Sequence, residues 1–124
     1  MIDFKNAAFL KLKPVDDKAF LHLISPMLTD GEFLIGTYQG LRDGVIFTNK
    51  RLIAVNVQGI TGKKKDFTSL PYSKIQAFSV ETAGVLDYDS ELDLWFSGLG
   101  HVRFEFVNTT NIAEICKLIS ERVL

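Results

Sequence analysis

The sequence has few of the residues that mark secreted or membrane-spanning proteins. Its 124 residues include a single cysteine, Cys116, which cannot form an internal disulfide. No apolar run approaches the roughly 18 residues that a transmembrane helix needs. The start, Met-Ile-Asp-Phe-Lys, lacks the basic segment, apolar run and cleavage site of a signal peptide. These absences predict a reducing, cytoplasmic location, with any membrane contact peripheral.

The chain also lacks an excess of charge of either sign. Lysine and arginine number 14, aspartate and glutamate number 15, and the net charge is −1. Such a balance gives no overall field to hold a polyanion, so we expect no nucleic-acid partner. The length predicts a single core that buries about 65–70% of the surface of the unfolded chain.

Motifs for catalysis and for metal binding are missing as well. His22 and His101 have no cysteine or second histidine at ligand spacing, so a zinc site is not expected. The sequence contains no nucleophile elbow and no phosphate-binding loop. We therefore predict a protein without a catalytic residue, a cofactor or a metal site. Cys116 lies on an apolar helical stripe and is interpreted as a core residue.

The stretch 40–56 is the most strongly specified part of the chain. Gly40 and Gly44 bracket a turn that contains Arg42 and Asp43, where glycine supplies the positive φ of a tight reversal. Residues 45–47 are β-branched or aromatic, 48–51 form a polar reversal, and the β pattern resumes at Leu52. This pattern predicts a β-hairpin.

The first 29 residues are predicted to be a helical extension. Phe4, Ala7, Ala8 and Leu12 share one face of a helix that Pro14 ends. Asp16 or Asp17 caps a second helix, which Pro26 closes early.

The remaining residues, 30–124, are predicted to form one mainly β domain. Strands are expected at residues 32–39, 63–69, 75–81, 92–96 and 101–107 besides the hairpin. Asn111, with Glu114 three residues later, begins an amphipathic C-terminal helix. We expect a β-sandwich or partly open barrel of about seven antiparallel strands, capped by the C-terminal helix and preceded by short N-terminal helices.

Three segments resemble the bacterial pleckstrin-homology-like (PH-like) domains. They are Gly-Leu-Arg-Asp-Gly-Val-Ile-Phe-Thr-Asn-Lys-Arg-Leu-Ile at 40–53, Gly-Ile-Thr-Gly-Lys-Lys at 59–64 and Pro-Tyr-Ser-Lys-Ile-Gln-Ala-Phe-Ser-Val-Glu-Thr-Ala-Gly at 71–84. The resemblance covers roughly positions 30–124, including the acidic segment at 89–95 and the last helix. It implies a seven-stranded PH-type sandwich without catalytic activity. It further implies a single-domain member that forms a cyclic homo-oligomer, a pentameric ring, and offers a polar surface to a protein partner.

The sequence departs from the eukaryotic lipid-binding members of that fold. Their phosphoinositide loop carries several lysines and arginines, whereas the loop here has one base, Arg42, beside one acid, Asp43. The tryptophan of their closing helix is also missing, because Trp95 falls in a predicted strand. Phosphoinositide binding is therefore not expected.

Lys63, Lys64 and Lys65 allow two interpretations. They form either a solvated strand edge that discourages aggregation or a patch for anionic lipid or nucleic acid, and we favour the strand edge. At roughly 1 kcal/mol per basic residue, three lysines supply only about 3 kcal/mol, which does not anchor a protein unaided. Lys50 and Arg51 allow the same two interpretations. Their location in a predicted turn favours a structural or interface role. The alternative function is thus a peripheral module that binds anionic membrane through these five residues.

The acidic series Asp87, Asp89, Glu91 and Asp93 places its carboxylates on one side of an extended segment. No glycine or glutamate stands in register for a calcium loop, so we expect pairing with basic groups of this or a neighbouring chain. Trp95 is predicted to point outward, where it either covers the N-terminal helices or contacts a partner. We place both features at the boundary between subunits of the ring, facing the lysines of the next copy.

Overall fold

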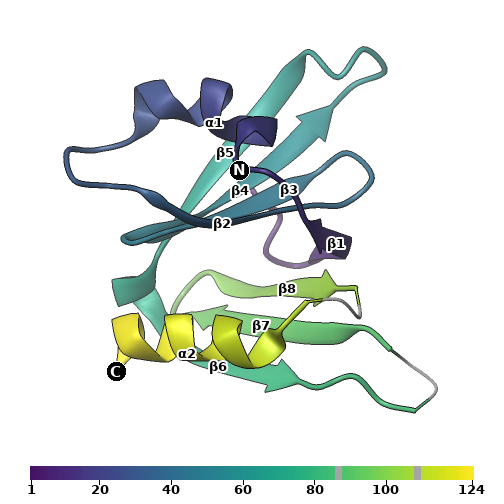
Figure 1. Cartoon of the computed structure of the whole chain (residues 1–124), viewed down its shortest axis with the longest axis vertical. Coiled ribbons are helices and arrows are strands. Elements are labelled where there is room, and N and C mark those ends of the chain that lie inside the picture. The colour runs from purple at the N-terminus through teal and green to yellow at the C-terminus, as the bar shows by residue number, and fades with distance from the viewer. Residues whose placement is uncertain (86–87, 108–109) are drawn as a thin grey trace.

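The computed structural model describes residues 1–85, 88–107 and 110–124, which form a curled, open sheet with one helix packed against one end (Figure 1). The elements are β1 (Ala7–Pro14), α1 (Lys18–Ile24), the 3₁₀ turn η1 (Ser25–Met27), β2 (Leu34–Gln39), β3 (Gly44–Thr48), β4 (Arg51–Gln58), β5 (Lys64–Pro71), the 3₁₀ turn η2 (Tyr72–Lys74), β6 (Ile75–Glu81), β7 (Ser90–Phe96), β8 (Gly100–Phe106) and α2 (Ile112–Val123).

The described strands form one sheet in the order β5-β4-β3-β2-β1-β8-β7-β6. Every neighbouring pair is antiparallel except β1 and β8, which run parallel. The two edges, β5 and β6, are consecutive in the chain and are joined by η2. The mainly β fold class and the C-terminal helix are confirmed, with eight strands where about seven were predicted.

The main core lies inside the curl of the sheet and beneath α2. Phe9 and Leu12 of β1 meet Phe104 and Phe106 of β8, and Ile119 of α2 closes the same cluster. A second, smaller cluster lies on the outer face of the hairpin. There Phe20 and Ile24 of α1 pack on Ile46, Ile53 and Val55. Because apolar side chains cover both faces, β3 is buried along its whole length.

The helix expected around Phe4 to Leu12 is wrong, because β1 occupies Ala7–Pro14. The error has a physical cause in the spacing of Phe9 and Leu12. A regular strand places every second residue on one face, but the register of β1 shifts between Phe9 and Leu12, where Lys11 has a φ of 54°. This bulge turns both side chains toward the core at a spacing of three, which in a sequence resembles a helical period.

Both helices begin near the predicted residues. The side chain of Asn111 accepts a hydrogen bond from the Glu114 backbone N–H at 3.3 Å, so the predicted start of α2 is confirmed. Asp17 precedes α1, and its carboxylate accepts from the Thr37 hydroxyl at 2.8 Å rather than capping the helix. Cys116 is half-buried on α2. Among the described residues, no helix combines the length and apolar character that crossing a bilayer requires.

Candidate functional site

Arg51, predicted as a binding residue, lies in a buried ion pair with Glu32. The guanidinium donates to both carboxylate oxygens of Glu32 at 2.9 Å, and the Glu32 side chain is fully buried. The same guanidinium donates to the Met27 carbonyl at 3.1 Å and to the Ser69 hydroxyl at 2.8 Å. Arg51 therefore joins β4 to the loop before β2 and to β5, which is a structural role.

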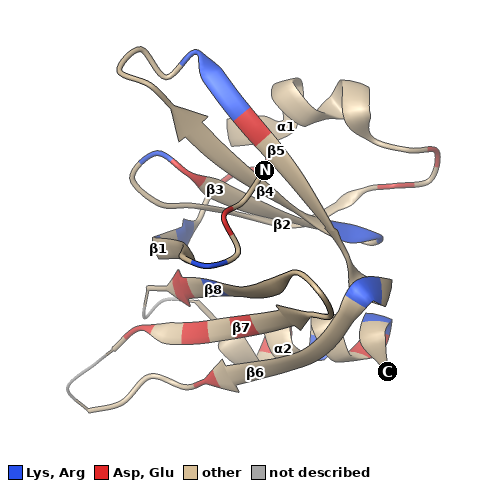
Figure 2. Ribbon diagram, turned by 180° about the vertical axis from the view of Figure 1, so that it is seen from behind, with Lys and Arg blue, Asp and Glu red and all other residues tan. Residues whose placement is uncertain are grey.

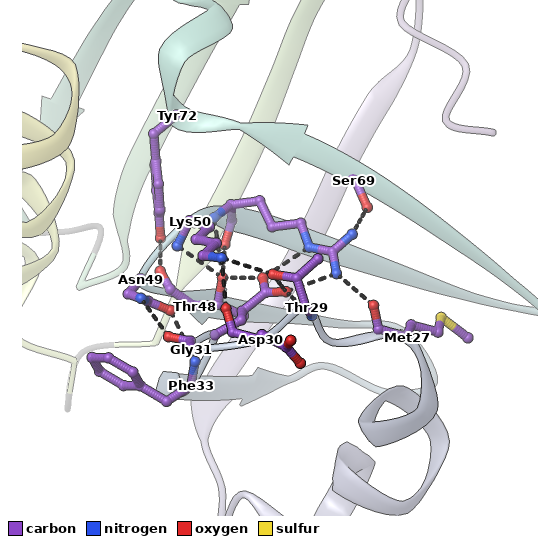
Figure 3. Close-up of polar contacts among 12 residues, drawn as sticks. Met27, Thr29, Asp30, Gly31, Phe33, Thr48, Asn49, Lys50, Ser69 and Tyr72 are labelled. Atoms are coloured by element: carbon purple, nitrogen blue, oxygen red, sulfur yellow. Dashed lines mark hydrogen bonds and ion pairs between the residues drawn. The ribbon is translucent and has the colours of Figure 1, made fainter.

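Lys50 is fixed in the same network, together with the hairpin turn (Figure 3). Its ammonium group donates to the Thr29 hydroxyl at 2.9 Å and to the Asp30 carbonyl at 3.0 Å. The neighbouring Asn49 accepts from the Phe33 N–H and donates to the Gly31 carbonyl. These contacts bind the loop 27–33 to the turn between β3 and β4.

The pKa of Glu32 reflects this environment. Burial alone raises the pKa, but hydrogen bonds from Arg51, the Thr29 N–H and the Thr48 hydroxyl, together with the charge of Arg51, lower it from 4.5 to about 2. The folded protein thus holds the carboxylate in its charged form more strongly than the unfolded chain does.

This shift predicts an acid-sensitive stability. The Glu32 contribution, about 3 kcal/mol, is complete above pH 4.5 and is lost as the pH falls toward about 2, because the depressed pKa favours the folded state only while the carboxylate is ionised. Urea unfolding across this pH range measures it. A Glu32→Gln variant carries no such group, so its free energy of unfolding should fall less steeply over the window. Equal slopes for the two proteins would contradict the assignment.

Lys50 and Arg51 do not join the three lysines at 63–65 in one patch. Arg51 is paired with Pro71 and Gln58 with Lys64, so the two basic groups lie at opposite ends of the β4–β5 ladder. The seven residue steps along β4 from Arg51 to Gln58 span roughly 23 Å. The structure thus separates the five residues that the membrane hypothesis grouped.

Lys64 and Lys65 begin β5, an edge of the sheet, and Lys63 immediately precedes it; we call these three residues the basic edge. Lys63 and Lys64 are exposed, while Lys65 is half-buried and donates to the Gly62 carbonyl at 2.9 Å. The charges make this edge a poor template for unspecific strand pairing.

Arg42 and Asp43 lie in the loop between β2 and β3, close to the loop before the basic edge. The Arg42 guanidinium donates to the Gly59 carbonyl, and the Asp43 carboxylate accepts from the Val57 N–H at 2.8 Å. Both side chains therefore connect the β2–β3 and β4–β5 loops.

Glu91 and Asp93 of the predicted acidic series lie on the outer face of β7, Asp89 immediately precedes that strand, and β6 and β8 add further carboxylates. We call this surface the acidic face; its described members are Glu81, Asp89, Glu91, Asp93 and Glu105. Asp87 of the predicted series lies outside the described residues. Glu91 stands directly opposite Glu105, a like-charge pair that destabilises a sheet unless cations lie nearby.

Cations from within the chain offset part of this charge. Asp93 is buried and accepts from Arg103 at 2.9 Å, and its carboxylate lies 2.6 Å from the His101 ring nitrogen. Lys11 pairs with Asp89 and Glu105. Pairing with basic groups of the same chain is thus observed for Asp89 and Asp93.

The pKa of Glu91 reflects both its burial and the charges around it. Burial raises the pKa of Glu91, Arg103 at 3.6 Å opposes the rise, and the neighbouring Glu81, Asp93 and Glu105 add to it. The hydrogen bond and charge of Asp93 in turn raise the pKa of Arg103. No group of three histidine, cysteine, aspartate or glutamate side chains in the described ranges is arranged to hold a metal ion.

Trp95 lies beside the acidic face and is 40% exposed. Its ring stacks on His101 with 4.8 Å between ring centroids. It does not cover the N-terminal helix, because α1 packs on the opposite half of the molecule against β3 and β4. A role in contacting a partner stays a prediction.

A groove that the sequence did not indicate lies between α2 and the strands β2 and β3. It has a volume of about 390 Å³, with Ile35, Tyr38 and Leu118 among its apolar lining and Glu114 and Lys117 at its rim. Burial, and then the charge of Glu114, raise the pKa of the Tyr38 phenol. None of the predicted site residues lines this groove. Its lining comes from distant segments, so no local motif signals it.

Comparisons with known proteins agree with this architecture. The family model for the bacterial PH domain matches residues 3–123. An uncharacterised protein of Bacillus subtilis, YjqA, is 42% identical over 117 residues, which are 93% of this chain and 90% of the relative. A protein with a pleckstrin-homology domain from Shewanella loihica has a solved structure with a TM-score of 0.81 and 39% identity, covering 92% of this chain and 98% of that one. The solved structure of a pleckstrin homology domain from Shewanella amazonensis has a TM-score of 0.68 and 42% identity, covering 89% of this chain and 90% of that one.

Proposed function

The chain belongs to the bacterial PH domain family, and we propose that it is a non-catalytic member that assembles head to tail into a closed homo-oligomeric ring and binds protein partners. The observation that carries this proposal is the separation of opposite charges. Figure 2 draws the lysines of β5 toward one end of the long axis and the carboxylates of β6 and β7 toward the other.

The proposal that the protein is not an enzyme rests on the contacts made by the ionisable side chains whose pKa values are strongly shifted. Glu32, whose pKa is strongly lowered, is fully committed to Arg51. The Tyr72 phenol, whose pKa burial raises strongly, donates to the Thr48 carbonyl at 2.7 Å. Neither Glu32 nor Tyr72 lines the groove between α2 and the strands β2 and β3. A catalytic acid–base pair would need two ionisable groups with shifted pKa values that face one cavity.

The placement of the two sheet edges supports the proposed ring. The basic edge is on β5, and Glu81 of the acidic face is on β6, so the two unpaired edges of the described sheet carry opposite charge. One copy can therefore present its basic edge to the acidic face of the next. A contact between different surfaces of identical subunits closes into a ring or grows into a fibre. The net charge of −1 gives little long-range repulsion between copies.

The resemblance of residues 40–53 to PH-like domains favours five subunits. In such a ring, the boundary between subunits includes Trp95 and the acidic face, and its rim forms the surface for a protein partner. Affinity capture from the native host with the intact protein, against a variant that does not assemble, tests whether a partner needs the ring.

Light scattering coupled to size exclusion tests assembly. The wild type should elute at physiological salt and micromolar concentration with several times the 13.9 kDa mass of one chain. Lys63→Glu combined with Lys64→Glu should shift it to a monomer, because like charges then face each other across the boundary. Adding Glu81→Lys to that variant should restore part of the assembly. A matched control is Lys117→Glu on α2, away from both charged surfaces. A monomeric wild type would refute the ring.

A further inference from the structure

The groove between α2 and the strands β2 and β3 lies beside a part of β2 that has a strand on one side only. β1 pairs with β2 at Gln39 and Tyr38, and the Val15 N–H donates to the Thr37 carbonyl at 3.0 Å. Over residues 34–36, no described strand pairs with β2 on the side away from β3. This part of β2 is therefore an open edge inside the strand order of the sheet.

A bulge turns Ile35 into the groove. The register of β2 with β3 shifts between Leu34 and Gly36, and Ile35 has no opposed residue in that ladder. Leu34 packs in the smaller apolar cluster outside the sheet, whereas Ile35 lines the groove and is 39% exposed. The bulge thus gives the groove an apolar side chain and leaves a residue outside the regular pairing of β2.

Contacts within the chain hold the groove open. The Tyr38 ring packs edge to face on Phe47, with 5.6 Å between ring centroids. Arg122 donates to the Asn49 carbonyl at 3.3 Å and so fixes the end of α2 to the turn between β3 and β4. A Cβ atom at Gly36 would lie 3.2 Å from the Tyr38 ring, so glycine keeps this space clear. The groove is therefore formed before any ligand arrives.

The dimensions of the groove fit an extended chain. Its helical wall runs from Glu114 to Arg122, which is about 12 Å of α-helix. About four residues of an extended segment cover that length. An α-helix of the same length, about 10 Å across, would occupy more than twice the volume of about 390 Å³.

The rim of the groove favours basic residues in that segment. Glu114 and Glu121 stand two turns apart on α2, and no ion pair in the described ranges involves Glu114. Glu121 is exposed and lies 4.0 Å from Arg122, which donates to two backbone carbonyls. Lys117 lies between the two glutamates. The two carboxylates are thus available to cations from outside the chain.

We propose that this groove binds an extended peptide segment of a partner protein, which pairs with residues 34–36 of β2 as an added strand. Alternate apolar side chains of the segment pack against Tyr38 and Leu118, and basic residues beside them meet Glu114 and Glu121. In this mode, main-chain hydrogen bonds supply affinity and the pockets for alternate side chains supply specificity. No residue of the basic edge or the acidic face lines the groove, so the site goes beyond the ring and its rim and is complete in one chain.

Fluorescence anisotropy of a labelled peptide tests the proposal. The probe has two leucines separated by a threonine, a lysine on each side and blocked termini. It should bind the full chain, and a peptide with glutamate in place of both lysines should bind at least tenfold more weakly at low salt.

Two substitutions in the groove should each weaken binding of the lysine peptide about tenfold, the effect of losing one buried aliphatic contact. Ile35→Ser removes the apolar side chain from the open edge, and Gly36→Val fills the space beside Tyr38. The matched control is Leu21→Ser, since Leu21 is 38% exposed on α1, which packs on the outer face of the sheet. Thermal unfolding checks that each variant is folded.

Strand addition is tested by two further peptides, N-methylated either at the leucines or at the residues between and beside them. Successive N–H groups of a strand point to opposite sides, so only one set can donate to β2. One of these peptides should bind like the unmethylated probe and the other at least tenfold more weakly. Equal affinities of the two would overturn strand addition.

No binding of the lysine peptide, or equal binding by the wild type and Ile35→Ser, would also overturn the proposal. Light scattering without peptide reports ring assembly separately, so failure of this site is distinguishable from failure of the ring. Loss of assembled mass in Ile35→Ser without peptide would assign the groove to a second copy of the chain and would equally overturn the proposal.

Discussion

Replacing Arg51 by methionine will reduce the free energy of unfolding by about 3–5 kcal/mol, the range for removal of one partner of a buried ion pair. Methionine keeps the aliphatic stem but leaves the Glu32 carboxylate, which is fully buried, without its guanidinium. The substitution also removes the hydrogen bonds to the Met27 carbonyl and the Ser69 hydroxyl. Equilibrium unfolding in urea at neutral pH measures the loss.

Two further variants separate the ion pair from general damage to the turn. Lys50→Met removes a neighbouring cation that is exposed, and should cost about 1 kcal/mol or less. Arg51→Met combined with Glu32→Gln leaves no buried charge without a partner, so the double variant should be more stable than Arg51→Met alone. If Arg51→Met and Lys50→Met unfold at the same urea concentration, Arg51 does not have the role assigned to it.

Truncating Leu12 to alanine will cost about 3 kcal/mol, within the range for a leucine removed from a packed core. Leu12 has no exposed surface and lies in the main cluster. It stands opposite Phe106, and its carbonyl accepts a hydrogen bond from the Val107 N–H at 2.9 Å. The cavity would open where β1 meets β8. Thermal and urea unfolding measure the effect.

Leu10→Ala is the matched control on the same strand, because the same atoms are removed from a side chain that is 58% exposed. Its expected cost is within about 0.5 kcal/mol. Equal losses at positions 10 and 12 would mean that β1 is only loosely attached to the sheet.

The strands with regular alternation could be predicted from the sequence alone. The hairpin at 40–56 has glycines at its first turn and β-branched residues on both sides, and the structure forms β3 and β4 there. Residues 92–96 and 101–107 alternate without interruption, and they pair as β7 and β8. In these segments, local preference and burial favour the same structure.

The irregular features could not be predicted in this way. A bulge at Lys11 changes the spacing of the inward side chains of β1, and the pattern alone favours a helix. The partner of Arg51 is nineteen residues away in the sequence, so its buried ion pair exists only after the loop 27–33 folds onto the hairpin. The position of the basic edge relative to the acidic face likewise depends on the order of strands, which periodicity does not encode.

The parallel pairing of β1 with β8 has a consequence for how the protein is made. Among the strands of the described sheet, β1 leaves the ribosome before all the others and β8 after them, so Phe9 and Leu12 have no partner on that side until β8 has been synthesised. The hairpins β3–β4 and β6–β7 can form earlier, because their strands are close in the sequence. Closure of the core is therefore a late step in biosynthesis, and a stalled nascent chain that lacks β8 would display an apolar strand to chaperones and proteases.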